Sequence, residues 1–158
     1  MGHMGEVAPD FVLKDQNDAE FRLSDQRGKK VILSFHPLAW TEFCAGQMIS
    51  LEKNADTFSA LNTIAVGISI DPRQTKRAWA KSLGISRTRL LSDFWPHGAV
   101  ATKFGLFREK NGISERAHLV LDEEHRLIFF RIYPVHSVPD ITEIIDLLKE
   151  TKPGERSG

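Results

Sequence analysis

The segment Lys30–Met48, KVILSFHPLAWTEFCAGQM, joins an apolar, β-branched run to a stretch of helical spacing, and the only cysteine of the chain follows the junction. The first six residues are typical of a strand that is buried on both faces of a sheet. From Thr41 onward the apolar residues recur at a helical period. We therefore expect Cys44 in the first turn of a helix that comes shortly after a buried strand.

The segments on both sides of this junction alternate between strand-like and helix-like periods. Their order is a hairpin, then β-α-β-α, then β-β-α, which predicts a mixed central sheet with helices on both faces. This is the thioredoxin-like arrangement of an α/β protein, here with an N-terminal hairpin. The expected elements are a hairpin at 11–15 and 21–25, strands at 30–35 and 63–70, a helix over 41–61, a helix from an Asp71 N-cap to Gly84, a short strand and helix within 90–107, a hairpin at 117–122 and 126–132, and a helix opened by Pro139.

Length and composition exclude several classes of protein. The 158 residues fit one domain, expected at 5–150, with 1–4 as a tag remnant and 151–158 as a flexible tail. Basic and acidic residues both number 21, so no basic stripe predicts nucleic-acid binding. No apolar stretch reaches the roughly 18–20 residues of a membrane span. The N-terminus lacks the apolar core of a secretory signal, so the expected location is the cytoplasm.

The lone cysteine restricts the chemistry further. It cannot form an internal disulfide or a cysteine zinc cluster, and the six histidines show no paired metal-ligand spacing. We therefore predict neither a metal nor a cofactor. Only a thiolate is a good nucleophile, and free cysteine has a pKa of roughly 8.5. Unpaired amide groups and the helix dipole favour an anion at a helix N-terminus, so the position of Cys44 favours a reactive thiolate.

Two neighbours of Cys44 strengthen this interpretation. Thr41 is the predicted N-cap, with a hydroxyl one turn from the sulfur, and Pro37 fixes φ and shapes a rigid loop wall. A lone cysteine is more often a small buried hydrophobe, and a threonine here is often only a cap. The combination of the three residues is far less common by chance, and it suits nucleophilic attack on a small polar substrate.

The same three residues resemble the signature P-x-x-x-T-x-x-C of the peroxiredoxins, the AhpC/TSA family. Further similarity covers roughly residues 5–150, in APDF, LSDQRGKKVILSF, GISIDPRQTKRAW and SERAHLVLD. The segment LLSDFWPHGAVATKFGLF (Leu90–Phe107) is especially similar to the AhpE-type peroxiredoxins, a branch of mostly one-cysteine enzymes.

The resemblance implies a thiol peroxidase that reduces hydrogen peroxide or organic hydroperoxides. Cys44 would be the peroxidatic cysteine, and its thiolate would become a sulfenic acid. Arg116 would stabilise the thiolate and the charge on the peroxide oxygens. Thr41 would position the peroxide, and Pro37 would shield the sulfenic acid from over-oxidation. By itself, Arg116 also fits an ordinary surface salt bridge.

Two further residues have supporting roles in this resemblance. Gln47 would join Thr41 in a polar network, although a solvated helix residue is the plainer interpretation. Trp79 would lie near the active site, and a role in the core fits equally well. Glu42 departs from the usual family pattern, and we expect it to face solvent.

Two histidines also depart from the pattern, and their roles stay open. His36 and His118 each fit either a hydrogen-bonded, structural histidine or a group that tunes the response to pH.

The absence of a second, resolving cysteine determines the expected partners. The sulfenic acid would be reduced by an external thiol, either a low-molecular-weight thiol or a glutaredoxin- or thioredoxin-like protein. The family forms dimers, so a homodimer is expected, with Phe94 and Trp95 as either a contact or part of the core. Two other functions stay open: a peroxide-sensing redox relay to a partner protein, and a thiol–disulfide oxidoreductase, against which the missing C-x-x-C counts.

Overall fold

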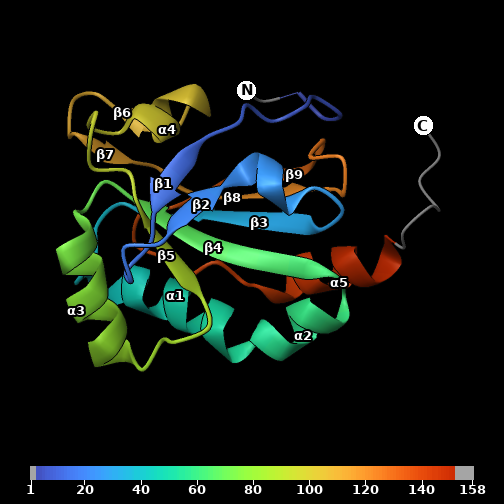
Figure 1. Ribbon diagram of the computed structural model, residues 1–158, viewed down its shortest axis with the longest axis horizontal. Coiled ribbons are helices and arrows are strands. Elements are labelled where there is room, and N and C mark those ends of the chain that lie inside the picture. Colours follow the sequence, from blue (N-terminus) through green and yellow to red (C-terminus); the bar gives the residue numbers. More distant parts are fainter. Residues whose placement is uncertain (1–2, 152–158) are drawn as a thin grey trace.

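The computed structural model describes residues 3–151 and has a mixed sheet with helices packed on both faces (Figure 1). The strands are β1 (Val12–Lys14), β2 (Glu20–Arg22), β3 (Lys30–Phe35), β4 (Thr63–Ser69), β5 (Arg89–Ser92), β6 (Phe107–Arg108), β7 (Ile113–Ser114), β8 (Arg116–Leu121) and β9 (Leu127–Tyr133). The helices are α1 (Glu42–Lys53), α2 (Ala55–Ala60), α3 (Arg73–Leu83), α4 (Ala99–Lys103) and α5 (Thr142–Glu150), and a 3-10 turn covers Leu23–Gln26.

The main sheet has the strand order β2-β1-β5-β4-β3-β8-β9 within the described residues. The pairs β3–β4 and β4–β5 are parallel. The other pairs of this sheet are antiparallel. The predicted mixed sheet of the thioredoxin-like arrangement is therefore confirmed. A short ribbon of β6 and β7, which the sequence did not predict, lies outside this sheet.

The side chains of β3 alternate between two buried clusters, one on each face of the sheet. Val31, Leu33 and Phe35 pack in a cluster that includes residues of α4. Ile32 packs in the other cluster, with residues of α1, α2, α3 and α5. Figure 1 shows the same division, with α4 on one side of the sheet and α1, α2 and α5 on the other. Ser34 shares the face of Ile32, so β3 places one hydroxyl beneath α1.

α1 packs closely on the sheet at Gly67, in the middle of β4. A Cβ on Gly67 would lie 2.3 Å from Sδ of Met48, far inside van der Waals contact. Because glycine has no Cβ, Met48 and the turns of α1 around it can approach the strand this closely.

The predicted helix over 41–61 is divided at Asn54 into α1 and α2, so the prediction of one helix is wrong. Asn54 has φ −102° and ψ 12°, and its side-chain amide donates to Ser50 O at 2.7 Å. Asparagine side chains compete for backbone hydrogen bonds in this way, which weakens a helix interior. The predicted apolar face is nevertheless confirmed on both sides of the break, because Leu51 and Phe58 are buried.

The helix predicted after Asp71 begins one position later than expected. Pro72 occupies the N-cap position of α3, and Gly84 ends the helix with φ +69°, as predicted. Asp71 does not cap the helix, because its Oδ2 accepts hydrogen bonds from Ala39 N at 2.8 Å and Ser69 Oγ at 2.5 Å. The carboxylate thereby ties the loop after β3 to the end of β4.

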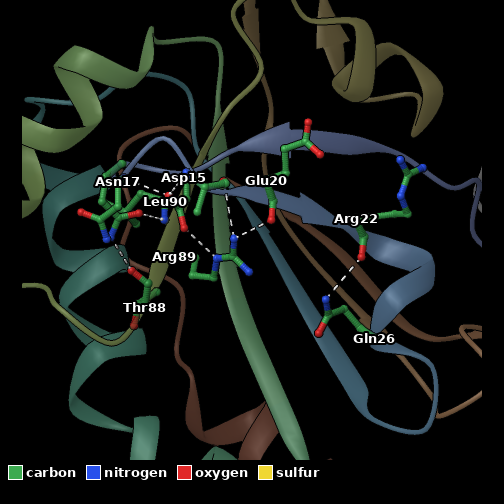
Figure 2. Close-up of polar contacts among 10 residues, drawn as sticks. Asp15, Asn17, Glu20, Arg22, Gln26, Thr88, Arg89 and Leu90 are labelled. Atoms are coloured by element: carbon green, nitrogen blue, oxygen red, sulfur yellow. Dashed lines mark hydrogen bonds and ion pairs between the residues drawn. The ribbon is translucent and has the colours of Figure 1, made fainter.

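Polar side chains hold the N-terminal hairpin against β5 (Figure 2). Arg89 Nε donates to Asp15 Oδ2 at 2.8 Å. The amide of Gln16 accepts from Leu90 N at 2.8 Å and donates to Thr88 O at 2.9 Å. These contacts extend the single residue pair between β1 and β5, so the predicted hairpin becomes one edge of the main sheet.

The chain joins the sheet from its first described residues, since Gly5 N donates to Leu127 O at 2.8 Å. At the other end, α5 begins at Thr142, later than the predicted start at Pro139. Residues 1–2 and 152–158, within the predicted tag remnant and tail, lie outside the described residues. Among the described residues, no helix is long and apolar enough to cross a membrane, and no group of three or more histidine, cysteine or acidic side chains could hold a metal ion.

Candidate active site

Cys44 lies in the first turn of α1, as predicted, and the loop 36–41 connects it to β3. The residue exposes 0% of its surface, a degree of burial that the sequence did not predict. It belongs to the apolar cluster that contains Ala39 and Met48. A peroxide therefore reaches the sulfur only when a covering side chain or the start of α1 moves.

Arg116, the first residue of β8, brings a guanidinium to this buried sulfur. Its Nη1 donates to Cys44 Sγ at 3.3 Å and to Gln47 Oε1 at 2.7 Å. Its Nε and Nη2 both donate to Val135 O, at 3.1 and 2.8 Å. The side chain is 2% exposed, so the alternative of a surface salt bridge is wrong. A cation that donates to the sulfur stabilises the thiolate more than the thiol.

Gln47 is buried three residues after Cys44, on the same face of α1. Its Oε1 accepts from Arg116, and its Nε2 donates to Ser34 Oγ at 2.7 Å and to Phe35 O at 3.0 Å. The alternative of a solvated residue is therefore wrong. The amide joins the guanidinium to β3. Among the described residues its hydrogen bonds go to Arg116, Ser34 and Phe35, so the expected link to Thr41 is wrong.

His118 and Ser34 continue this network away from the sulfur. A hydrogen bond of 2.9 Å connects His118 Nε2 and Ser34 Oγ, and both residues are buried. Burial, followed by the charge of Arg116, lowers the pKa of His118 to about 3, so the imidazole is neutral near pH 7. The sequence did not identify Ser34 as a site residue. Its signal was a hydroxyl in an otherwise apolar strand.

Thr41 occupies the N-cap position of α1, but its side chain makes no capping hydrogen bond. Its hydroxyl instead donates to Leu38 O at 2.8 Å, and the residue is exposed. The expected cap is thus correct in position and wrong in its hydrogen bond. Pro37 is buried in the same loop, as expected of a residue in the loop wall.

The middle of this loop is fixed in an unusual conformation. Trp40 has φ +66°, a value that is uncommon for a bulky residue, and 56% of its surface is exposed. One residue earlier, Ala39 N is held by Asp71 at 2.8 Å. Such backbone strain persists where the surrounding structure holds it, and it is frequent at active sites.

A second polar group lies at the base of the loop, where β3 ends. His36 is buried, and its Nε2 lies 2.7 Å from Lys76 Nζ of α3. The ring of His36 packs against Trp79, with 5.4 Å between the ring centroids. Trp79 is 1% exposed, so it lies in the core, and its contact with His36 places it next to the loop. Lys76 was not among the site residues expected from the sequence.

Glu42, Phe94 and Trp95 lie at the surface. Glu42 is exposed, as expected. Phe94 and Trp95 expose 48% and 82% of their surfaces, so their alternative role in the core is wrong.

Comparison with known proteins agrees with this geometry. The model of the AhpC/TSA family matches residues 4–130. Over 123 residues the chain is 42% identical to alkyl hydroperoxide reductase E of Mycobacterium tuberculosis (strain ATCC 25618 / H37Rv), which covers 77% of this chain and 80% of that protein.

Solved structures show the same likeness. Reduced 2-Cys peroxiredoxin of Plasmodium vivax has a TM-score of 0.84 and 25% identity, covering 94% of this chain and 81% of that one. Peroxidoxin BcpB from Mycobacterium tuberculosis has a TM-score of 0.82 and 26% identity, and the match covers 98% of both chains. The chain therefore belongs to the AhpC/TSA family, and it is a peroxiredoxin, that is, a thiol peroxidase, with a single cysteine.

Proposed function

We propose that Cys44 carries the peroxidase reaction. Its thiolate attacks one oxygen of hydrogen peroxide or an organic hydroperoxide, an S–O bond forms and the O–O bond breaks. The sulfur is oxidised to a sulfenic acid, and the leaving oxygen takes up one proton to give water or an alcohol. The observation that supports this role is the contact of 3.3 Å between Arg116 Nη1 and Cys44 Sγ.

Arg116 is proposed to act on the thiolate and on the developing charge of the leaving oxygen. Its guanidinium is held at opposite edges by Gln47 and by the carbonyl of Val135. A donor that is already fixed needs little reorganisation during the reaction, which is the basis of electrostatic catalysis. Gln47 is thus proposed as a positioning residue, because its side chain holds Arg116.

Thr41 and Pro37 are proposed to act when the site opens. The hydroxyl of Thr41 already lies at the start of α1, and exchanging Leu38 O for a peroxide oxygen would let it position the substrate. Pro37 lacks an N–H group and is buried, which supports a role in shielding the sulfenic acid from a second peroxide.

An external thiol is proposed to complete the cycle, because the chain holds no second cysteine. The thiol forms a mixed disulfide with Cys44 and releases water. A second thiol then attacks the mixed disulfide, which releases the reduced enzyme and leaves the two external thiols joined as a disulfide. A low-molecular-weight thiol and a glutaredoxin- or thioredoxin-like protein both fit. A homodimer and a cytoplasmic location remain predictions from the sequence.

A redox relay is the second candidate function, and the complete burial of Cys44 favours it. A buried sulfenic acid would be reached slowly by reductants and could persist until a specific partner binds. Fast single-turnover oxidation with slow turnover in the presence of every thiol tested would support the relay.

The proposed role of Cys44 is tested with Cys44→Ser and with Ala45→Ser, a matched control on the next residue of α1. Peroxide consumption with a reducing thiol should be lost in the first variant and unchanged in the second. Since the chain has one cysteine, trapping of a sulfenic acid in the wild type reports on Cys44 alone. Consumption by Cys44→Ser at the wild-type rate would overturn the proposal.

A further inference from the structure

Ser34 and His118 form a buried polar pair beneath α1, and the mechanism above makes no use of them. The antiparallel pairing of β3 and β8 places the two residues directly opposite each other. Both side chains are fully buried. A buried hydroxyl and a buried imidazole each cost free energy unless they form hydrogen bonds, so a purely structural position in the core would favour apolar residues.

The pair ends a chain of hydrogen bonds that begins at the Cys44 sulfur. Arg116 Nη1 lies 3.3 Å from Cys44 Sγ and 2.7 Å from Gln47 Oε1. Gln47 Nε2 lies 2.7 Å from Ser34 Oγ, which in turn lies 2.9 Å from His118 Nε2. All five residues are buried, so bulk water does not compete for these contacts.

The groups on either side of Gln47 determine how its amide is oriented. The guanidinium of Arg116 can only donate, and the carbonyl of Phe35 can only accept. Gln47 therefore turns Oε1 towards Arg116 and Nε2 towards Phe35 O, at 3.0 Å. In the reverse orientation two donors would meet at Arg116 and two acceptors at Phe35. Because Nε2 also reaches Ser34, the serine oxygen must accept from the amide.

The hydroxyl of Ser34 then needs an acceptor for its own hydrogen. His118 Nε2 is that acceptor when the neutral ring carries its proton on Nδ1. This tautomer leaves one buried group, the Nδ1–H, without a hydrogen-bond partner among the described residues. The other tautomer would leave two, the lone pair of Nδ1 and the serine hydrogen. Since an unsatisfied buried polar group is costly, the Nδ1–H form is favoured.

The imidazole of His118 stays an acceptor through the neutral range of pH. Burial, followed by the charge of Arg116, lowers the pKa of His118 to about 3. The ring packs edge to face with Tyr133, with 5.2 Å between the ring centroids, and the hydroxyl of Tyr133 donates to Glu143 of α5. The ring is therefore both neutral and held in place by its neighbours.

We propose that Ser34 and His118 are positioning residues for the peroxidase reaction. Ser34 donates to His118, which directs the serine oxygen to accept from the Gln47 amide. The amide oxygen then faces Arg116 and holds the guanidinium against the sulfur. This inference rests on the proposed role of Cys44 as the nucleophile.

The first test changes each residue of the pair in two ways. Ser34→Ala and His118→Phe remove the hydroxyl and the acceptor, whereas Ser34→Thr and His118→Gln keep them. Stopped-flow tryptophan fluorescence with hydrogen peroxide should show oxidation about 3- to 10-fold slower in the first two variants, and within about twofold of the wild type in the other two. Thr63→Val, which removes a buried hydroxyl at the other end of the parallel strands, should keep the wild-type rate.

Wild-type rates in Ser34→Ala and His118→Phe would overturn the proposal, and so would equal losses in the variants that keep the hydroxyl and the acceptor. A double-mutant cycle separates positioning from a general effect on the fold. Adding Ser34→Ala to Gln47→Met should slow oxidation by less than about twofold, because the amide that the hydroxyl fixes is already absent. A further loss as large as that in the wild-type background would also overturn the proposal.

A third measurement examines the wild-type ring and does not depend on the folding of a variant. Nitrogen-15 NMR of the histidine rings distinguishes the two tautomers, and His118 should carry its proton on Nδ1 near pH 7. A proton on Nε2 would overturn the proposal. If Cys44→Ser retains peroxidase activity, the proposed function fails. If that variant is inactive while Ser34→Ala and His118→Phe are oxidised at the wild-type rate, only the inference about the pair fails.

Discussion

Replacement of Gln47 by methionine tests whether the buried network positions Arg116. Methionine has a similar length but removes the acceptor for Arg116 at 2.7 Å and the donor to Ser34 at 2.7 Å and Phe35 O at 3.0 Å. A hydrogen bond to a charged group contributes about 1.5–3 kcal/mol, and a buried group left unsatisfied costs a further 1–3 kcal/mol or so. We therefore expect a loss of about 2–4 kcal/mol in the free energy of unfolding.

The same change should slow the oxidation of Cys44 by about 10- to 100-fold, because Arg116 retains Val135 O as an anchor but loses the amide. Urea unfolding gives the stability, and stopped-flow fluorescence gives the rate. Gln74→Met, at an exposed position of α3, is the matched control and should leave both unchanged. An unchanged oxidation rate in a destabilised Gln47→Met would refute the reasoning, since the network would then support the fold without positioning the guanidinium.

Two other predictions concern Thr41 and His118. If the Thr41 hydroxyl positions the substrate, Thr41→Val should lower the second-order rate constant for oxidation by peroxide by roughly tenfold, and Thr41→Ser should stay near the wild type. Equal rate constants for the two variants in stopped-flow experiments would exclude this role of the hydroxyl. His118 has a pKa lowered to about 3, below the ordinary 6.5, so the unfolded chain binds more protons between these values and stability falls as the pH falls from about 6.5 towards 3. His118→Phe should therefore lose less stability than the wild type between about pH 6.5 and 4.5 in urea unfolding, by up to about 1 kcal/mol per pH unit; parallel losses would contradict a neutral, buried imidazole.

The sequence predicted the parts of the fold that depend on local patterns. The position of β3 and the end of α3 at Gly84 were predicted correctly, because both depend mainly on residues that are close in the sequence. The division of the long helix at Asn54 was missed, because the apolar residues keep their helical spacing across Asn54. The break is associated with one hydrogen bond of the Asn54 side chain, which the apolar pattern does not show. The burial of Cys44 could not be predicted, since it depends on how the loop after β3 closes over the sulfur.

The polar network of the site was harder to find than its nucleophile. The family signature identified Cys44, and the wider resemblance to the family identified Arg116. The partner of a polar residue in a buried strand, such as Ser34, depends on long-range pairing. The spacing in α3 did indicate that Lys76 is buried. Trp79 and Ala80 follow Lys76 by three and four residues, so the three side chains share the buried face of the helix. A lysine on such a face is a candidate for a functional group.

The proposed mechanism needs a cation that holds Cys44 as a thiolate, and Arg116→Ala tests this requirement directly. The measurement is the rate of Cys44 oxidation by hydrogen peroxide at neutral pH, with Arg108→Ala, a half-buried position of β6, as the control. We predict a rate about 10²- to 10³-fold lower for Arg116→Ala, and a rate near that of the wild type for the control. Oxidation of Arg116→Ala at the wild-type rate would contradict the account.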